Sequence, residues 1–262
     1  MKTRRDNMAK ILKLLVFVII TAYTGSVLAQ SSECVKPLKV AVYVDNGARG
    51  EGAFRWVQIA TIAENITSTF IDGEAVRSGV LDDIDLLIMP GGSSQRISKS
   101  LGEVGHEKVK SFIRAGGGYI GTCAGCCVLM QSDDKKHKNM MNIIPYTFGV
   151  CGGKADVDID FNDKATEIVG IANGPWSIRY SQGPVPVKTT TKEKDLNTVV
   201  VASYAKSIKS MGEEPWVQFP GHPAAFACTY GKGKIFAITV HPEMDFNDHG
   251  VFKSAISTKL ES

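Results

Sequence analysis

The first half of the chain alternates short, continuously apolar runs with longer amphipathic stretches. Residues 38–44 form a run that is apolar except for Lys39, which is typical of a strand in a parallel sheet covered on both faces. Residues 53–65 carry apolar side chains at helical spacing. The alternation continues with predicted strands at 68–71, 85–89 and 119–122 and a predicted helix at 103–115. This order predicts an α/β fold with a flavodoxin-like, doubly wound, mostly parallel sheet.

Beyond Pro145 the pattern becomes rich in β-structure. Gly231-Lys232-Gly233 is typical of a hairpin turn between two apolar runs. A helix is expected to close the chain at 246–260. Because the sequence shows no internal repeat and no low-complexity linker, we expect one domain over residues 30–262. The strands predicted in this half lie at 155–160, 185–189, 199–202, 225–230 and 234–240.

Residues 1–29 have the pattern of a secretory signal peptide. Five Lys and Arg residues precede the apolar run 14–20, and Ser26-Val27-Leu28-Ala29 provides a cleavage site of small residues. We therefore expect an exported protein, periplasmic or secreted, with no stable membrane insertion after cleavage. The alternative is an uncleaved anchor, because residues 11–29 are nearly long enough to span a bilayer.

Composition narrows the possible partners. The chain has 262 residues, is 44% hydrophobic and 22% charged, and has a formal net charge of +3. That charge is too small to indicate nucleic acid, and no basic stripe with interleaved aromatics occurs. The five histidines show no metal-ligand spacing, so we expect neither a metal nor a cofactor. A small-molecule or peptide substrate is the expected partner, and the oligomeric state stays open.

The most specific chemical motif is Gly121-Thr122-Cys123-Ala124-Gly125, which directly follows an apolar strand. It has the form of a strand–nucleophile–helix turn, with cysteine where hydrolases more often carry serine. Such a turn strains the backbone and leaves no space for side chains at the flanking positions. A cysteine at the start of a helix also lies at the positive end of the helix dipole, which favours the reactive thiolate.

A candidate base follows the last predicted strand, where His241-Pro242-Glu243 begins directly after residue 240. A cysteine nucleophile needs a base within hydrogen-bond reach and a third group that orients the base. Functional groups of open α/β sheets gather at the carboxyl ends of strands, where Cys123 and His241 are both expected. The rival His222 lies between prolines before a strand, so we prefer His241.

Three further segments are candidates for the site. The backbone N–H groups of Gly91, Gly92 and Ala124 are placed to form an oxyanion hole. Arg49, in the loop after the first strand, is a candidate to hold a substrate carboxylate, or else a solvated surface residue. Arg179 and Tyr180 lie in a segment rich in turn formers that is expected to close over the nucleophile or to pack as an ordinary loop.

These residues carry a resemblance to a known family. Tyr43-Val44-Asp45-Asn46-Gly47-Ala48-Arg49-Gly50, Met89-Pro90-Gly91-Gly92 and residues 116–125 resemble the family named after the N-terminal domain of eukaryotic biotin–protein ligases. More broadly, residues 38–258 look like a class I glutamine amidotransferase-like protein. The resemblance implies Cys123 as nucleophile, His241 as base and Glu243 as its orienting group. The chain shows no G-R-G-R-like adenylate-forming segment, so biotin transfer is not implied.

The sequence therefore predicts an exported thiol hydrolase that cleaves an amide, peptide or γ-glutamyl-type bond. One alternative is a ligand-binding module that uses the same fold without turnover. Another is redox chemistry at the C-x-x-C formed by Cys123 and Cys126. Export would also permit disulfides, and the pairing of Cys34, Cys151 and Cys228 stays open.

Overall fold

We analysed a computed structural model of the chain. It describes residues 36–48, 50–62, 65–131, 139–150, 152–188, 196–205 and 220–245. The predicted signal peptide at 1–29 and the predicted helix at 246–260 lie outside the described residues, as do Arg49, Cys34 and Cys151.

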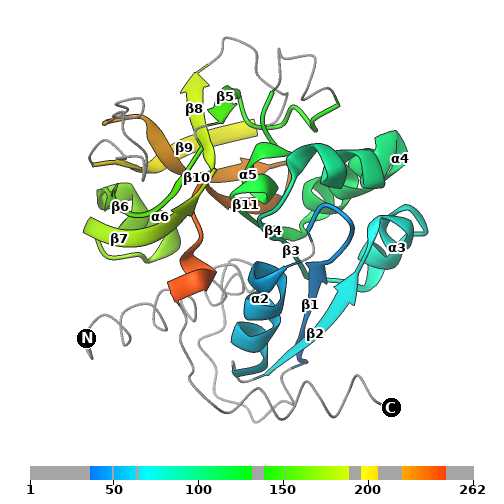
Figure 1. The fold of residues 1–262 in the computed structure, drawn as a ribbon. Helices are drawn as coiled ribbons and strands as arrows, with labels where there is room; N and C mark the ends of the chain where they lie inside the picture. Colours follow the sequence, from blue (N-terminus) through cyan, green and yellow to red (C-terminus); the bar gives the residue numbers. More distant parts are fainter. Residues whose placement is uncertain are drawn as a thin grey trace, which may run out of the picture.

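One half of a nine-stranded sheet is parallel (Figure 1). Its strands run in the spatial order β2-β1-β3-β4-β11, which is the flavodoxin-like order. The predicted fold class is therefore confirmed. The bounds of these strands are β1 (Leu38–Tyr43), β2 (Ile66–Ile71), β3 (Leu86–Met89), β4 (Gly118–Thr122) and β11 (Gly233–Ile238).

The other half of the sheet is antiparallel and continues from β11 in the order β10-β9-β6-β7. The β-rich second half of the chain is thereby confirmed, including the hairpin turn at 231–232. β5 and β8 form a separate two-stranded sheet. These elements are β5 (Tyr146–Val150), β6 (Lys154–Phe161), β7 (Gly174–Ser181), β8 (Pro184–Lys188), β9 (Leu196–Tyr204) and β10 (Pro223–Tyr230).

The segment predicted as a loop around Arg179 and Tyr180 is a strand, so that expectation is corrected. Turn formers such as Gly174 and Pro175 led to the loop prediction. In the structure β7 pairs with β6 along its whole length, from Gly174 opposite Phe161 to Ser181 opposite Lys154. β7 is the last strand of the sheet, where a proline is tolerated because one side of the strand needs no ladder bonds.

Helices cover both faces of the sheet. Alternate residues of β1 divide between two hydrophobic clusters, with Val40 and Val42 in one and Ala41 and Tyr43 in the other. The first cluster also contains residues of α2 and α6, and the second contains residues of α3, α4 and α5. Burial on both sides explains why an inner parallel strand such as β3 is continuously apolar. The helices are α2 (Glu51–Ile62), α3 (Gly73–Arg77), α4 (Ser94–Ala115), α5 (Ala124–Cys127) and α6 (Asp163–Val169), with 3-10 turns η1 (Val80–Asp83) and η3 (Pro242–Asp245).

α4 begins well before the predicted start at residue 103. Its first part is capped by Ser93, whose Oγ accepts a hydrogen bond from the backbone N–H of Arg96 at 3.4 Å. Gly102 then interrupts the helix with non-helical angles of φ 61° and ψ −178°. This break divides the apolar pattern in two, so only the second part resembles a helix in the sequence.

The last strand also differs from the prediction, because β11 ends at Ile238 and not at residue 240. Thr239, just past the strand, still donates its backbone N–H to the carbonyl of Ala224 on β10 at 2.9 Å. His241 then pairs with β7, donating its backbone N–H to the carbonyl of Arg179 at 2.8 Å. The loop after β11 is therefore fixed to the antiparallel half of the sheet.

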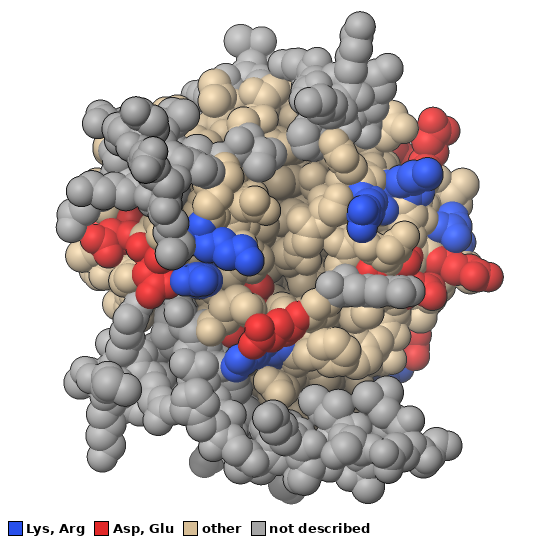
Figure 2. All heavy atoms as spheres, viewed as in Figure 1, with Lys and Arg blue, Asp and Glu red and all other residues tan. Residues whose placement is uncertain are grey.

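On the face shown in Figure 2, described acidic and basic side chains stand next to one another. Elsewhere in the described chain, exposed side chains of opposite charge pair directly, as Lys164 does with Glu167. Within the described ranges, no helix is long and apolar enough to cross a membrane.

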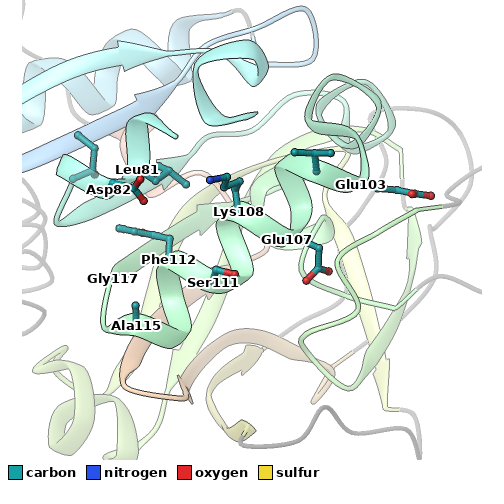
Figure 3. A pocket seen from close by; sticks show the side chains of 11 residues that line it. Leu81, Asp82, Glu103, Glu107, Lys108, Ser111, Phe112, Ala115 and Gly117 are labelled. Carbon is teal, nitrogen blue, oxygen red and sulfur yellow. The ribbon is translucent and has the colours of Figure 1, made fainter. Parts of the chain in front are cut away.

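A surface groove of about 810 Å³ lies between η1 and α4 (Figure 3). Leu81, Glu107 and Phe112 are among its lining residues. It also reaches Ile84 and Gly117, which precede β3 and β4, so it lies at the amino-terminal edge of the parallel strands. The motif around Cys123 follows the carboxyl end of β4, so the groove takes no part in chemistry at this cysteine.

The packing of the turn after β4 can be tested with Gly125→Ala. A Cβ at Gly125 would lie 1.9 Å from the backbone oxygen of Met89, which cannot move without distorting β3. We expect the free energy of unfolding to fall by about 1–3 kcal/mol, the usual cost of overpacking. Urea unfolding measures this change.

Gly149→Ala is the matched control, because nothing lies within 4 Å of a Cβ at that position. Its free energy of unfolding should stay within about 0.5 kcal/mol of the wild type. Equal stability of the two variants would show that the turn does not need glycine at position 125.

Candidate functional site

The turn after β4 holds Cys123 in a strained backbone conformation, with φ 49° and ψ −107°. Positive φ is uncommon for a residue with a side chain and persists only where the surroundings enforce it. The N–H of Cys123 donates to the carbonyl of Ile238 at 2.8 Å, which ties the turn to β11. Its carbonyl accepts the N–H groups of Cys126 and Cys127 at 3.0 and 3.1 Å, which begins α5. The predicted strained turn is confirmed.

Glycines surround Cys123 because neighbouring atoms leave no space for a Cβ. At Gly121 a Cβ would lie 2.5 Å from the backbone oxygen of Gly125. At Gly91 it would lie 2.3 Å from Cε1 of His241 and 3.3 Å from Cβ of Cys123. Gly91 therefore packs directly on the two side chains that the sequence singled out as nucleophile and base.

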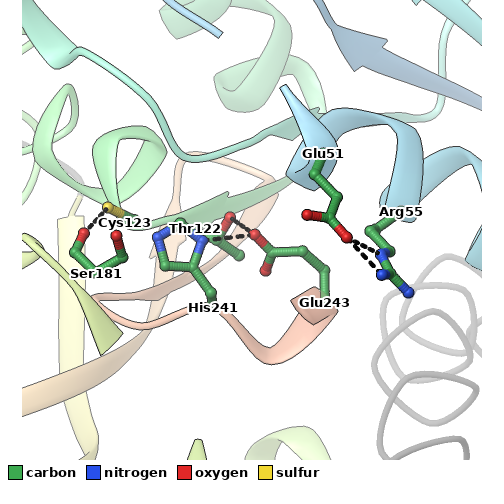
Figure 4. Close-up of polar contacts among 7 residues, drawn as sticks. All are labelled: Glu51, Arg55, Thr122, Cys123, Ser181, His241 and Glu243. Atoms are coloured by element: carbon green, nitrogen blue, oxygen red, sulfur yellow. Dashed lines mark hydrogen bonds and ion pairs between the residues drawn. The ribbon is translucent and has the colours of Figure 1, made fainter. Parts of the chain in front are cut away.

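His241 lies between Cys123 and Glu243 (Figure 4). Its Nδ1 is 2.8 Å from Oε1 of Glu243, and the other ring nitrogen faces Cys123. The side chains are shielded from solvent, with 13% of His241 and none of Glu243 exposed. The structure thus brings together the three residues predicted from the sequence, from β4, the loop after β11 and η3.

The charges around His241 determine its protonation. Burial by itself lowers the pKa of the imidazole, but interactions with Cys123 and Glu243 outweigh it and raise the pKa to about 10. His241 is therefore protonated at neutral pH. A buried imidazolium of this kind requires an anionic neighbour, and the Glu243 carboxylate lies 2.8 Å from its Nδ1.

Glu243 is held in a tight space beside α2. Thr122 donates its hydroxyl to Oε1 at 3.4 Å, and a Cβ at Gly52 would lie only 3.1 Å from the same oxygen. The second oxygen, Oε2, is buried without a hydrogen-bond partner among the described residues. Only one carboxylate oxygen is thus satisfied, and it is the oxygen that faces His241.

β7 contributes backbone atoms to the site. The carbonyl of Ser181 accepts a weak hydrogen bond from Sγ of Cys123 at 3.8 Å (Figure 4), and the carbonyl of Arg179 holds the backbone of His241. The Arg179 side chain is 42% exposed and lies 3.6 Å from Asp156. Sequence analysis missed Ser181 because a backbone carbonyl has no side-chain signature.

Tyr180 does not line the site. Its side chain is fully buried in the core, its hydroxyl donates to the carbonyl of Gly183 at 2.9 Å, and its ring packs edge-on against Tyr204. The expectation that it binds substrate is corrected, because alternate residues of a strand face opposite sides of the sheet. Arg179, on the other side, retains an accessible side chain.

The three candidate oxyanion donors lie around the turn. Gly92 has φ 147°, and a Cβ there would lie 2.0 Å from the carbonyl of Gly47, so the loop after β1 packs against it. Among the described residues, no backbone hydrogen bond engages the N–H groups of Gly91, Gly92 or Ala124. The role of these three N–H groups as an oxyanion hole therefore stays a prediction, and the geometry is compatible with it.

The rival base lies elsewhere. Nδ1 of His222 is 3.1 Å from the carbonyl of Pro186, on β8. His241, and not His222, therefore lies beside Cys123. In the part of the chain that the structure describes, no cluster of three or more His, Cys, Asp or Glu side chains is arranged to hold a metal ion.

Asp45 organises the loop that contains Arg49. Its carboxylate accepts hydrogen bonds from the hydroxyls of Tyr43 (3.2 Å) and Ser100 and from the N–H groups of Asn46 and Gly73. Burial opposes ionisation, but these donors, led by Ser100, lower the pKa of the carboxyl. The sequence analysis quoted Asp45 without assigning it this role.

A flavodoxin-like parallel half-sheet, a cysteine in the strained turn after β4 and a histidine after the adjacent strand define a class I glutamine amidotransferase-like fold. Comparison with known proteins supports this class. Over 174 residues, covering 65% of this chain and 71% of the relative, the chain is 30% identical to a pyridoxal 5'-phosphate synthase subunit PdxT of Haloquadratum walsbyi. The chain belongs to the class I glutamine amidotransferase-like superfamily, and its residues 62–132 match the family described as "Biotin-protein ligase, N terminal".

Other matches are shorter or more distant. The chain is 37% identical to the PdxT subunit of Natronomonas pharaonis over 73 residues, which cover 27% of this chain and only 38% of that relative. The chain thus spans little more than a third of this relative's length. A thua-like protein from Bacteroides uniformis has a similar structure, with a TM-score of 0.55 at 12% identity over 82% of this chain and 86% of that one. This likeness shows the fold alone.

The raised pKa of His241 predicts a pH-dependent stability. The pKa is about 6.5 in an unfolded chain and about 10 in the fold. Protonated His241 therefore stabilises the fold fully below about pH 6.5, and this contribution is lost as the pH rises through about 10. The test is urea unfolding of the wild type and of His241→Gln at pH 6.5, 8 and 10. The difference between their free energies of unfolding, in favour of the wild type, should shrink by at least about 1 kcal/mol from pH 6.5 to pH 10. A pH-independent difference would contradict the assignment.

Proposed function

We propose that the chain is a cysteine-dependent amide hydrolase that cleaves an amide, peptide or γ-glutamyl-type bond. Cys123 is the nucleophile, His241 the acid and base, and Glu243 the group that orients His241. The observation that carries this proposal is the placement of the His241 ring between Cys123 and the buried Glu243 carboxylate. A cysteine nucleophile requires both partners in this order.

The first step uses the charges already present. In the proposed step Cys123 attacks as the thiolate, and the adjacent His241 cation stabilises that charge. The sulfur attacks the acyl carbon and forms a tetrahedral intermediate. His241 then gives the proton of the nitrogen facing Cys123 to the departing amine, and the C–N bond breaks to leave an acyl-thioester.

The second step restores the enzyme. The now neutral imidazole takes a proton from water, and the resulting hydroxide attacks the thioester carbonyl. The C–S bond breaks, the carboxylic acid leaves, and His241 and Cys123 return to their charged forms. Glu243 accepts a hydrogen bond from Nδ1–H throughout, which keeps the other ring nitrogen directed at the reacting atoms.

The backbone N–H groups of Gly91, Gly92 and Ala124 are the proposed donors to the oxyanion in both steps. The positions of these residues support the proposal. Gly91 packs on Cys123 and His241, and Ala124 directly follows the nucleophile in the chain. Arg49, which lies outside the described residues, and the exposed side chain of Arg179 are proposed to meet a carboxylate of the substrate.

We further propose that residues 1–29 direct export and that residues 30–262 form the mature domain, periplasmic or secreted. A small-molecule or peptide substrate fits this location, and no nucleic-acid partner is proposed.

The test is the rate of iodoacetamide alkylation at Cys123 between pH 6 and 9, with the site identified by mass spectrometry. We expect fast labelling of the wild type even at pH 6–7, where an ordinary thiol with a pKa of about 8.5 reacts slowly. His241→Ala should slow labelling at pH 7 at least about tenfold, because the cation that stabilises the thiolate is lost. Glu243→Gln should slow it less.

His222→Ala is the matched control, because this histidine lies against Pro186 and away from Cys123. Its labelling should equal that of the wild type. Slow, ordinary labelling of wild-type Cys123 would overturn the proposal and favour a ligand-binding module. Fast labelling would justify a screen of amides for ammonia or amine release.

A further inference from the structure

Three more cysteines surround the proposed nucleophile. Cys123, Cys126, Cys127 and Cys228 are all buried free thiols. Cys126 and Cys127 follow Cys123 within α5, and Cys228 lies on β10, two strands away from β4. The proposed mechanism uses only the first of the four.

We propose that Cys123 and Cys126 form a reversible oxidation site, in which a disulfide between them protects the nucleophile from peroxide. This inference rests on the proposed function in one respect, namely that Cys123 is a reactive thiolate. It adds an activity that hydrolysis does not need.

The backbone brings the two residues to bonding distance. Both Cys126 and Cys127 donate their N–H groups to the carbonyl of Cys123, so the turn between them is helical. Residues three apart in a helical turn have Cα atoms about 5 Å from each other, and disulfides form at Cα separations of about 4.4–6.8 Å. The Cα spacing is therefore compatible with a disulfide.

The surroundings distinguish Cys126 from Cys127. Cys126 is fully buried, and it lies within electrostatic range of both Cys123 and Cys228. Cys127 also lies within electrostatic range of Cys123, but it differs from Cys126 in having a side-chain hydrogen bond with Ser94 at the start of α4. Burial raises the pKa of Cys126 well above its usual range, so it keeps its proton while Cys123 reacts.

The chemistry balances with hydrogen peroxide as the oxidant. The Cys123 thiolate attacks one peroxide oxygen, the O–O bond breaks, and hydroxide leaves with Cys123 as a sulfenic acid. The Cys126 sulfur then attacks the Cys123 sulfur, the S–O bond breaks, and the departing hydroxide takes the Cys126 proton to form water. An external dithiol reduces the disulfide and restores the nucleophile.

The experiment begins with the fully reduced, full-length protein. Iodoacetamide labelling of Cys123 is measured first. The protein is then treated with hydrogen peroxide, free thiols are blocked with iodoacetamide, the protein is reduced, and newly released thiols are labelled with N-ethylmaleimide. Tandem mass spectrometry assigns each label to its cysteine.

In the wild type we expect N-ethylmaleimide on Cys123 and Cys126 together, and full recovery of Cys123 labelling after dithiothreitol. In Cys126→Ala, peroxide should convert Cys123 to the sulfinic and sulfonic acids, with at least tenfold less recovery. Cys127→Ala and Cys228→Ala are the matched controls and should behave as the wild type. Cys126→Ser repeats the test if the alanine variant does not fold.

Irreversible oxidation of Cys123 in the wild type, or pairing with Cys127 or Cys228 instead, would overturn the assignment. Failure of the proposed function is a separate result, because it appears as slow labelling of Cys123 before any peroxide is added. Fast initial labelling without a Cys123–Cys126 bond would overturn only the oxidation site.

Discussion

The approach of Gly125 to the carbonyl of Met89 is the contact on which the rest of the site depends. The start of α5 lies against the end of β3 with no side chain between them. This closeness fixes where α5 begins, and with it the strained backbone of Cys123. Gly91, two residues after Met89, packs against both the nucleophile and His241. A side chain at any of these glycines would separate the elements that carry the reacting groups.

Charge is the second constraint. The pKa of His241 is raised to about 10 only because a carboxylate and a thiol lie on either side of the imidazole, shielded from solvent. Removing one member of such a group leaves the others buried and uncompensated. Stability and reactivity therefore depend on the same three side chains, and the backbone of β7 holds two of them in place.

The parallel half of the fold was readable from the sequence because burial on both faces makes an inner strand such as β3 continuously apolar. β7 was not readable, because its pairing with β6 is a tertiary effect that overrides Gly174 and Pro175. The placement of Cys123, His241 and Glu243 followed from short local motifs. Ser181 acts through a backbone carbonyl and leaves no such mark. Tyr180 was misplaced because a residue in an unrecognised strand cannot be assigned to a face.

The two halves of the sheet also set an order of assembly. β11 pairs with β4 on one side and with β10 on the other. His241 follows β11, so the base reaches the site only after the antiparallel strands have been synthesised. Thr122 and Glu243, which touch in the finished protein, are 121 residues apart. At ordinary rates of protein synthesis, of roughly 5–20 residues per second, this separation corresponds to roughly ten seconds. A nascent chain therefore exposes Cys123 as an ordinary thiol, and its partner arrives only when the final strand is inserted.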